Sequence, residues 1–156
     1  MSAAEPANVV RSILVGTDGS DTAGVAVAHA IELARALGAR LLVVSAYEPI
    51  AAHHLQAARV AAPADVEWAV NPRDEVLSLL ASAEQDARAA GVAQVETFAR
   101  VGDAADAILD VAEEQRCDLI VVGNKGMTGA TRFLLGSVPN KVSHHAPCSV
   151  LIVRTS

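Results

Sequence analysis

Short runs of apolar residues alternate along this chain with longer segments in which apolar residues recur every three or four positions. A strand that is covered on both faces needs near-continuous apolar residues, so the short runs predict buried strands. The longer segments have the spacing of helices with one apolar face. The strands are expected at residues 12–18, 40–46, 94–101, 118–122 and 149–153.

Helices are expected between these strands, each with recognisable ends. The first begins at Ser20 or Asp21 and ends at Gly38, a residue that tolerates positive φ. The second runs from 73 to about 90, the third follows the N-cap Asp103, and the last spans about 137–145. The apolar face of the first helix is expected to consist of Val27, Ala30, Ile31, Ala34 and Leu37.

Residues 47–72 form the least regular part of the sequence. They include three prolines and show no clear periodicity, which is typical of a long functional loop. A short helix is expected within it, at about 50–62.

Strands separated by helices predict parallel pairing, with helices on both faces of the sheet. We therefore expect an α/β fold with a doubly wound, five-stranded parallel sheet of order 3-2-1-4-5. The alternation in residues 94–101 suits an edge strand. A length of 156 residues is typical of one domain, so a single domain over 1–156 is predicted, with residues 1–10 flexible.

Composition and charge narrow the classes of partner. The chain has 12 Lys and Arg against 18 Asp and Glu, a formal net charge of −6. Because this balance repels phosphate backbones and anionic lipid, neither nucleic acid nor a membrane is expected as a partner. Residues 1–10 do not resemble a signal peptide. Cys117 and Cys148 are expected to be small buried residues in a reducing cytoplasm.

Glycine-rich segments follow the first and fourth strands. In an open parallel sheet, ligands bind beyond the carboxyl ends of the strands where strand order reverses, which here lies between these two strands. Glycines let backbone N–H groups approach an anion, and a helix N-terminus stabilises its charge. Each glycine alone also fits a simple turn. The segments are Gly16-Thr17-Asp18 after the first strand, and Gly123-x-x-Gly126 after the fourth, followed after nine intervening residues by Gly136-Ser137.

The helix that opens at Gly136-Ser137 is the predicted anion site. Ser137 is expected to be its N-cap and to donate its hydroxyl to a phosphate oxygen, while Pro139 is tolerated in a first turn. Lys125 and Arg132 lie in the preceding loop, either as phosphate-neutralising groups or as solvated charges.

The segments ILVGTDGSD, DLIVVGNKG, LLGSV and PCSVLIV resemble the universal stress protein family over residues 12–153. The resemblance implies a non-catalytic stress-response protein that binds ATP at the switch point. Cyclic AMP or AMP as the ligand, and slow ATP hydrolysis, remain alternatives, and Mg²⁺ would enter only through the nucleotide. Two cytoplasmic copies are expected to pair their C-terminal edge strands as a homodimer.

The resemblance also implies which residues bind the nucleotide. They are Gly16, Thr17 and Asp18 for the adenine and ribose, Ala46 for the base, Val122 and Gly123 for the ribose, and Gly126, Gly136, Ser137 and Val138 for the phosphates. Pro139 stands where the family often has a hydroxyl residue, which leaves the number of bound phosphates open.

Enzymes of similar architecture need motifs that this sequence lacks. It contains no GxxxxGK[ST] phosphate loop and no GxGxxG after the first strand. A phospho-receiver domain needs an acidic cluster after the first strand, where this chain has Asp18 alone, and a lysine after the fifth. His144 and His145 lack a third metal ligand. No catalytic and no metal-binding residue is therefore predicted.

Overall fold

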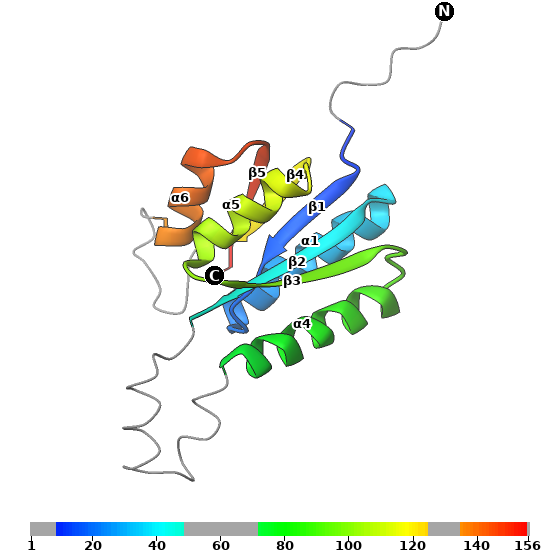
Figure 1. The fold of residues 1–156 in the computed structure, drawn as a ribbon. Coiled ribbons are helices and arrows are strands. Elements are labelled where there is room, and N and C mark those ends of the chain that lie inside the picture. Colours follow the sequence, from blue (N-terminus) through cyan, green and yellow to red (C-terminus); the bar gives the residue numbers. More distant parts are fainter. Residues whose placement is uncertain (1–8, 49–71, 125–134, 156) are drawn as a thin grey trace, which may run out of the picture.

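The computed structural model describes residues 9–48, 72–124 and 135–155. The strands form one parallel sheet in the order β3-β2-β1-β4-β5, which confirms the predicted α/β fold and strand order (Figure 1). The elements in chain order are β1 (Ser12–Gly16), α1 (Asp21–Leu37), β2 (Arg40–Tyr47), α4 (Pro72–Ala89), β3 (Val95–Val101), α5 (Ala104–Glu114), β4 (Leu119–Gly123), α6 (Ser137–His145) and β5 (Ser149–Val153).

The centre of the sheet is fully buried because helices cover both faces. In β1, Leu14 pairs in register with Leu42 of β2 and Ile120 of β4, and all three side chains have no exposed surface. This burial explains the continuous apolar runs of the inner strands. The strand β3 lies at an edge of the sheet, as predicted, and most of its residues are half-buried rather than alternately buried and exposed.

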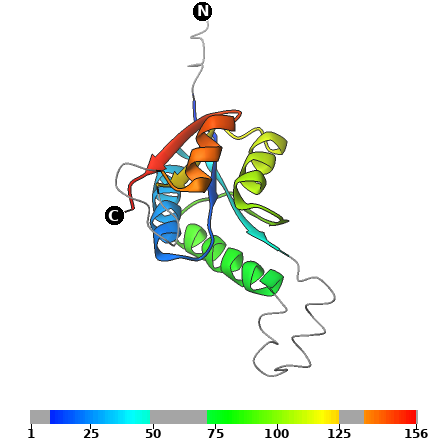
Figure 2. The same cartoon turned by 90° about the vertical axis from the view of Figure 1, so that its left-hand side faces the viewer.

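The two faces of the sheet carry two separate cores. The helices α1 and α4 cover one face and α5 and α6 cover the other (Figures 1 and 2). Successive strand residues point to opposite faces, so Ile13 and Val15 pack with α1 and α4, whereas Leu14 packs with α5. Cys117, 6% exposed, lies in the second core with the half-buried Cys148, and burial raises the pKa of the Cys117 thiol to about 11.

The predicted helix caps are present on α1 and α5. Ser20 is the N-cap of α1, and its hydroxyl accepts a hydrogen bond from the backbone N–H of Ala23 at 3.2 Å. Gly38 ends that helix in the left-handed conformation, with φ of 64°. Asp103 caps α5 by accepting a hydrogen bond from the N–H of Asp106 at 3.1 Å. Local sequence therefore determines where these helices begin.

The predicted apolar face of α1 is only partly correct. Ala30 and Ala34 are buried as expected, but Leu37 is 54% exposed and Val27 is half-buried. The buried stripe consists of Ala26, Ala30 and Ala34, spaced four residues apart. Such small side chains let the helix axis approach the sheet closely, so the larger apolar residues lie beside the contact line.

Some expectations for the middle of the chain lie outside the described residues. The helix expected at 50–62 is among them, and the structure resumes with α4. Within the three described ranges, none of the helices combines the length and the apolar character needed to cross a bilayer.

A polar network joins the amino ends of the strands. The carboxylate of Asp118, just before β4, accepts hydrogen bonds from the backbone N–H groups of Arg11 and Ser12 at 2.9 and 3.0 Å. It also accepts one from the Ser12 hydroxyl at 3.3 Å. Because Ser12 is only 4% exposed, Asp118 supplies the partner for a buried donor.

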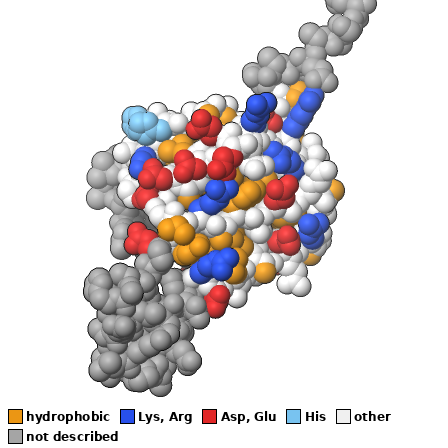
Figure 3. All heavy atoms as spheres, viewed as in Figure 1, with side chains coloured by type: hydrophobic (Ala, Val, Ile, Leu, Met, Phe, Trp, Pro, Cys, Tyr) orange, Lys and Arg blue, Asp and Glu red, His pale blue; other side chains and the backbone are white. Residues whose placement is uncertain are grey.

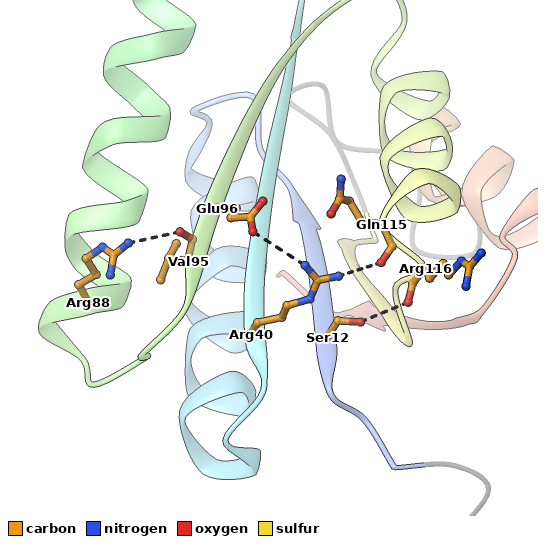
Figure 4. A network of polar contacts seen from close by, with 7 residues as sticks. All are labelled: Ser12, Arg40, Arg88, Val95, Glu96, Gln115 and Arg116. Atoms are coloured by element: carbon orange, nitrogen blue, oxygen red, sulfur yellow. Dashed lines mark hydrogen bonds and ion pairs between the residues drawn. The ribbon is translucent and has the colours of Figure 1, made fainter.

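Arg40 extends this network across the start of β2. Its guanidinium donates to the carbonyl of Gln115 at 2.8 Å and lies 3.9 Å from the carboxylate of Glu96, so it joins the end of α5 to β3 (Figure 4). The amino end of the sheet is thus cross-linked by side chains from elements that are distant in sequence.

Candidate functional site

A cavity of about 450 Å³ lies at the opposite end of the sheet, beyond the carboxyl ends of β1, β2 and β4. Its volume falls within the usual range of small-molecule sites. Strand order reverses between β1 and β4, so the cavity occupies the switch point where α/β sheets bind ligands. The described lining includes nine of the ten predicted site residues: Gly16, Thr17, Asp18, Ala46, Val122, Gly123, Gly136, Ser137 and Val138. Gly126, the tenth, lies outside the described residues.

The end of β1 approaches α5 so closely that a side chain at Gly16 would have to displace that of Ile108. A Cβ atom on Gly16 would lie 2.6 Å from Cδ1 of Ile108, and both residues line the cavity. The next residue, Thr17, donates its backbone N–H to the carbonyl of Val44 at 3.0 Å, which fixes the end of β1 to β2. The absent side chain at Gly16 therefore leaves space that Ile108 and the cavity share.

The loop after β1 is held by its own side chains. The Asp18 carboxylate accepts a hydrogen bond from the N–H of Ser20 at 2.9 Å, and the Thr17 hydroxyl accepts one from the N–H of Gly19 at 3.2 Å. Gly19 has φ of 83°, which few other residues adopt. Asp18 thus shapes the turn and also lies at the cavity wall.

Asn124 joins the two sides of the segment that follows β4. Its carbonyl accepts a hydrogen bond from the N–H of Gly136 at 3.0 Å, although residues 125–135 separate the two. Its side-chain oxygen accepts bonds from the N–H and hydroxyl of Thr155, at 3.0 and 2.8 Å. These bonds place the start of α6 beside the end of β4. Sequence reasoning missed this role, for which an amide residue directly after a buried strand was the available signal.

The predicted N-cap of α6 is wrong by one residue. Gly136, with extended backbone angles of −63° and 166°, is the N-cap, and its carbonyl accepts the first helical bond from Asn140. Ser137 is instead the first helical residue. Among the described residues, no side chain caps this helix, unlike α1 and α5. The backbone N–H groups of Ser137 and Val138 precede the first helical bond, whereas Pro139 has no N–H to offer.

The cavity combines an apolar floor with the positive ends of helices. Val44, Val122 and Ile108 line it and also belong to the second core, so the floor continues the hydrophobic interior. The first turns of α1, α5 and α6 contribute the surrounding wall, and each helix N-terminus carries partial positive charge. Asp18 is the one charged side chain in the part of the lining that the structure describes.

Sequence reasoning missed several lining residues in the first turns of helices. Their signal was position, because a helix that follows a strand of a parallel sheet begins at the carboxyl edge. They are Ser20, Thr22 and Ala23 at the start of α1, and Ala104, Ala107 and Ile108 near the start of α5. Val44 of β2 and Leu135, just before α6, were missed as well.

Comparison with known proteins identifies the family. The sequence profile of the universal stress protein family matches residues 10–154. The chain belongs to this family. Universal stress protein Rv1636 of Mycobacterium tuberculosis strain H37Rv is 38% identical over 146 residues, which cover 94% of this chain and 97% of that protein. The predicted resemblance is therefore confirmed.

Solved structures of universal stress proteins share the fold. One, determined in complex with cyclic AMP, is 35% identical with a TM-score of 0.69, and the match covers 95% of this chain and 99% of the other. Another, from Archaeoglobus fulgidus in complex with dAMP, is 25% identical with a TM-score of 0.61, over 92% of this chain and 98% of the other. Both relatives thus have an adenine nucleotide as their bound molecule.

Proposed function

We propose that this protein binds an adenine nucleotide in the switch-point cavity and acts through binding, without turnover. The base lies over the apolar floor formed by Val44, Val122 and Ile108, and the phosphate lies against the start of α6. The observation that carries this proposal is the N-terminus of α6, which no side chain of the described residues caps, at the rim of an apolar cavity. Exposed backbone donors at a helix start favour an anion, whereas an apolar floor favours a flat base.

The comparisons support the same class of ligand. Two universal stress protein structures that align with nearly the whole chain were determined with cyclic AMP and with dAMP. The predicted site residues Ala46, Gly123 and Val138 line the cavity beside the floor and the helix start, as expected for a bound nucleotide. These are the grounds for extending adenine-nucleotide binding to this chain.

ATP is the first candidate ligand, and cyclic AMP is the second. ATP carries several negative charges, which Lys125 and Arg132 of the preceding loop would neutralise, with Mg²⁺ entering bound to the phosphates. Two features favour cyclic AMP, a ligand with a single charge. Pro139 has no N–H, so the first turn of α6 has two N–H groups without a helical partner, those of Ser137 and Val138, and the 35%-identical relative was determined with cyclic AMP. AMP is the intermediate case, and slow ATP hydrolysis is the alternative to binding alone.

The test is to identify the small molecules released when freshly purified protein is denatured, and then to titrate ATP, AMP and cyclic AMP by calorimetry. GTP is the matched control for the base, and adenosine is the control for the phosphate. We expect at least one adenine nucleotide to bind and to raise the melting temperature with concentration. Failure of all three to bind would overturn the proposal. If the protein releases ADP from ATP as fast as it binds ATP, ATP hydrolysis would replace binding alone as the proposed function.

The edge strand β5 supports the proposal of a homodimer in the cytoplasm. In the described part of the sheet β5 pairs with β4 alone, and its Leu151 is 38% exposed. Pairing of two such edges around a two-fold axis would cover both the backbone groups and this apolar side chain. The two free thiols fit a reducing compartment. A monomer mass that stays constant across micromolar concentrations in sedimentation would overturn the dimer.

A further inference from the structure

Lys141 of α6 reaches across to the first turn of α5. Its ammonium nitrogen lies 2.7 Å from Oδ1 of Asp106 and 3.6 Å from Oδ2 of Asp103, the N-cap residue. The hydrogen bond to Asp106 raises the pKa of Lys141, so the lysine is charged throughout the physiological pH range. All three side chains are about half exposed, so the group lies at the surface.

This charged group adjoins the rim of the cavity. On α5, Asp103 lies four residues before Ala107 and Asp106 directly precedes it, and Ala107 lines the cavity. On α6, Lys141 lies three residues after Val138, which also lines the cavity. Residues three or four apart share one face of a helix. Asp103 and Lys141 therefore lie one turn away from lining residues of α5 and α6, and the ion pair holds Asp106 beside Lys141.

The helix α5 presents a strongly acidic surface. Acidic side chains gather over α5 in the space-filling view, with few basic side chains among them (Figure 3). At its far end the carboxylate of Glu114 is paired with Arg100. At the near end, next to the cavity, Lys141 is the cation that the described residues place against Asp103 and Asp106. The exposed carboxylates are Asp106, Asp110, Glu113 and Glu114, together with the N-cap Asp103.

We propose that Lys141 makes the site accept anionic ligands, because it offsets the two carboxylates that α5 places beside the phosphate position. The inference rests on the proposed function, since it needs the phosphate to lie between α5 and α6. Lys141 is a positioning residue that acts through Asp103 and Asp106. Unpaired carboxylates beside the cavity would repel a phosphate through partly exposed space, and salt screens such a repulsion.

The experiment compares ATP, cyclic AMP and uncharged adenosine by calorimetry at about 50 mM salt, where surface charges act over a long range. Lys141→Gln is expected to lower the affinity by about threefold to tenfold for the nucleotide that the wild type prefers. It is expected to leave adenosine binding unchanged. Lys141→Arg keeps the charge and is expected to bind as the wild type does. Arg35→Gln is the matched control, because it removes one cation and one exposed ion pair, with Glu32, at the far end of α1.

A double variant separates charge compensation from a mechanical link between the helices. Lys141→Gln with Asp106→Asn lacks the ion pair but restores the net charge beside the cavity. We expect it to regain most of the lost nucleotide affinity. The defect of the single variant is also expected to shrink to less than about twofold in 0.5 M salt, where the Debye length is only a few ångströms.

Two results would overturn the inference while nucleotide binding stands. One is a Lys141→Gln variant with the nucleotide affinity of Arg35→Gln. The other is an equal loss for adenosine and nucleotide, without rescue by Asp106→Asn, which would assign Lys141 to holding the helices together. A wild-type protein that binds none of the nucleotides would overturn the proposed function, and the inference with it.

Discussion

The two ends of the sheet are held together by different kinds of contact. At the amino end, charged and polar side chains bridge elements far apart in sequence: Asp118 accepts hydrogen bonds from Ser12, 106 residues away. At the carboxyl end, residues with small side chains or none, such as Gly16, Ala46 and Gly136, surround a cavity of about 450 Å³. Polar contacts therefore close the amino end of the sheet, whereas the carboxyl end contains a cavity.

This difference separates stability from binding within one small molecule. A cavity forgoes the dispersion contacts that a packed core would make, so the elements around it need support from elsewhere. Backbone bonds supply part of that support, since Thr17 and Gly136 donate to the carbonyls of Val44 and Asn124. The amino-end network supplies the rest without entering the cavity. We therefore expect substitutions at one end to change stability and substitutions at the other to change affinity.

The largest expected effect comes from removing the hydrogen bonds to Asp118 at the amino end of the sheet. Asp118→Ala removes the acceptor of three hydrogen bonds and leaves the N–H of the buried Ser12 without its partner. Hydrogen bonds to a charged group contribute about 1.5–3 kcal/mol, so we expect the free energy of unfolding to fall by about 3 kcal/mol. Urea denaturation measures this loss, and calorimetry should show nucleotide affinity within about twofold of wild type at temperatures where the variant is folded.

Asp118→Asn is the matched control, because it keeps an acceptor oxygen and loses only the charge. We expect it to lose about half as much stability as the alanine variant. A nucleotide affinity that fell together with stability in this pair would show that the two ends of the sheet are coupled, contrary to the comparison.

A smaller effect, confined to binding, is expected at the carboxyl end. Ser137→Asp places a carboxylate at the first helical residue of α6, where a negative charge interacts favourably with the helix dipole. The same charge repels a phosphate at that helix start. We expect nucleotide affinity to fall at least about tenfold, whereas the melting temperature of the ligand-free protein stays constant or rises.

Ser137→Asn controls for the loss of the hydroxyl, since it adds no charge. We expect its affinity to fall less than about threefold, the range of one weak neutral hydrogen bond. An aspartate variant that bound nucleotide normally would move the phosphate away from α6 and would remove the main support of the proposed function.

The fold was readable from the sequence because its determinants are local and redundant. The apolar runs of β1, β2 and β4 persist through the centre of the sheet, where both faces are covered and apolar residues predominate. Caps such as Ser20 and Asp103 then defined two helix starts. Leu37 was misplaced because apolar periodicity does not show that small alanines form the contact line of α1.

The candidate site could be predicted from the sequence only in part, and for a different reason. The glycines around it indicate local backbone geometry, such as the positive φ of Gly19 in the loop after β1. The roles of Asp118 and Lys141 depend on side chains brought together only by the fold, so nothing beside them in the sequence indicated their partners. The N-cap of α6 was missed because Ser137 is a common capping residue, yet the carbonyl of Gly136 accepts the first helical bond.

The smallest expected effect also concerns the amino end of the sheet. There Cys117, directly before Asp118 in the sequence, is buried in the second core. Burial raises the pKa of this thiol from 9.0 to about 11. In the unfolded chain the thiol therefore loses its proton at lower pH than in the folded protein, so stability falls as pH rises from about 9 to about 11 and is unaffected below pH 9.

Cys117→Ala removes this alkaline sensitivity. Between pH 8 and pH 10, wild type is expected to lose about 1 kcal/mol more of its free energy of unfolding than the variant, as measured by urea denaturation under reducing conditions. Cys148 titrates in both proteins, so its contribution largely cancels in the difference. Because the thiol lies away from the cavity, nucleotide affinity should show the same pH dependence in both proteins. Equal losses of stability would mean that water reaches Cys117 and that the amino end is less tightly closed than its hydrogen bonds imply.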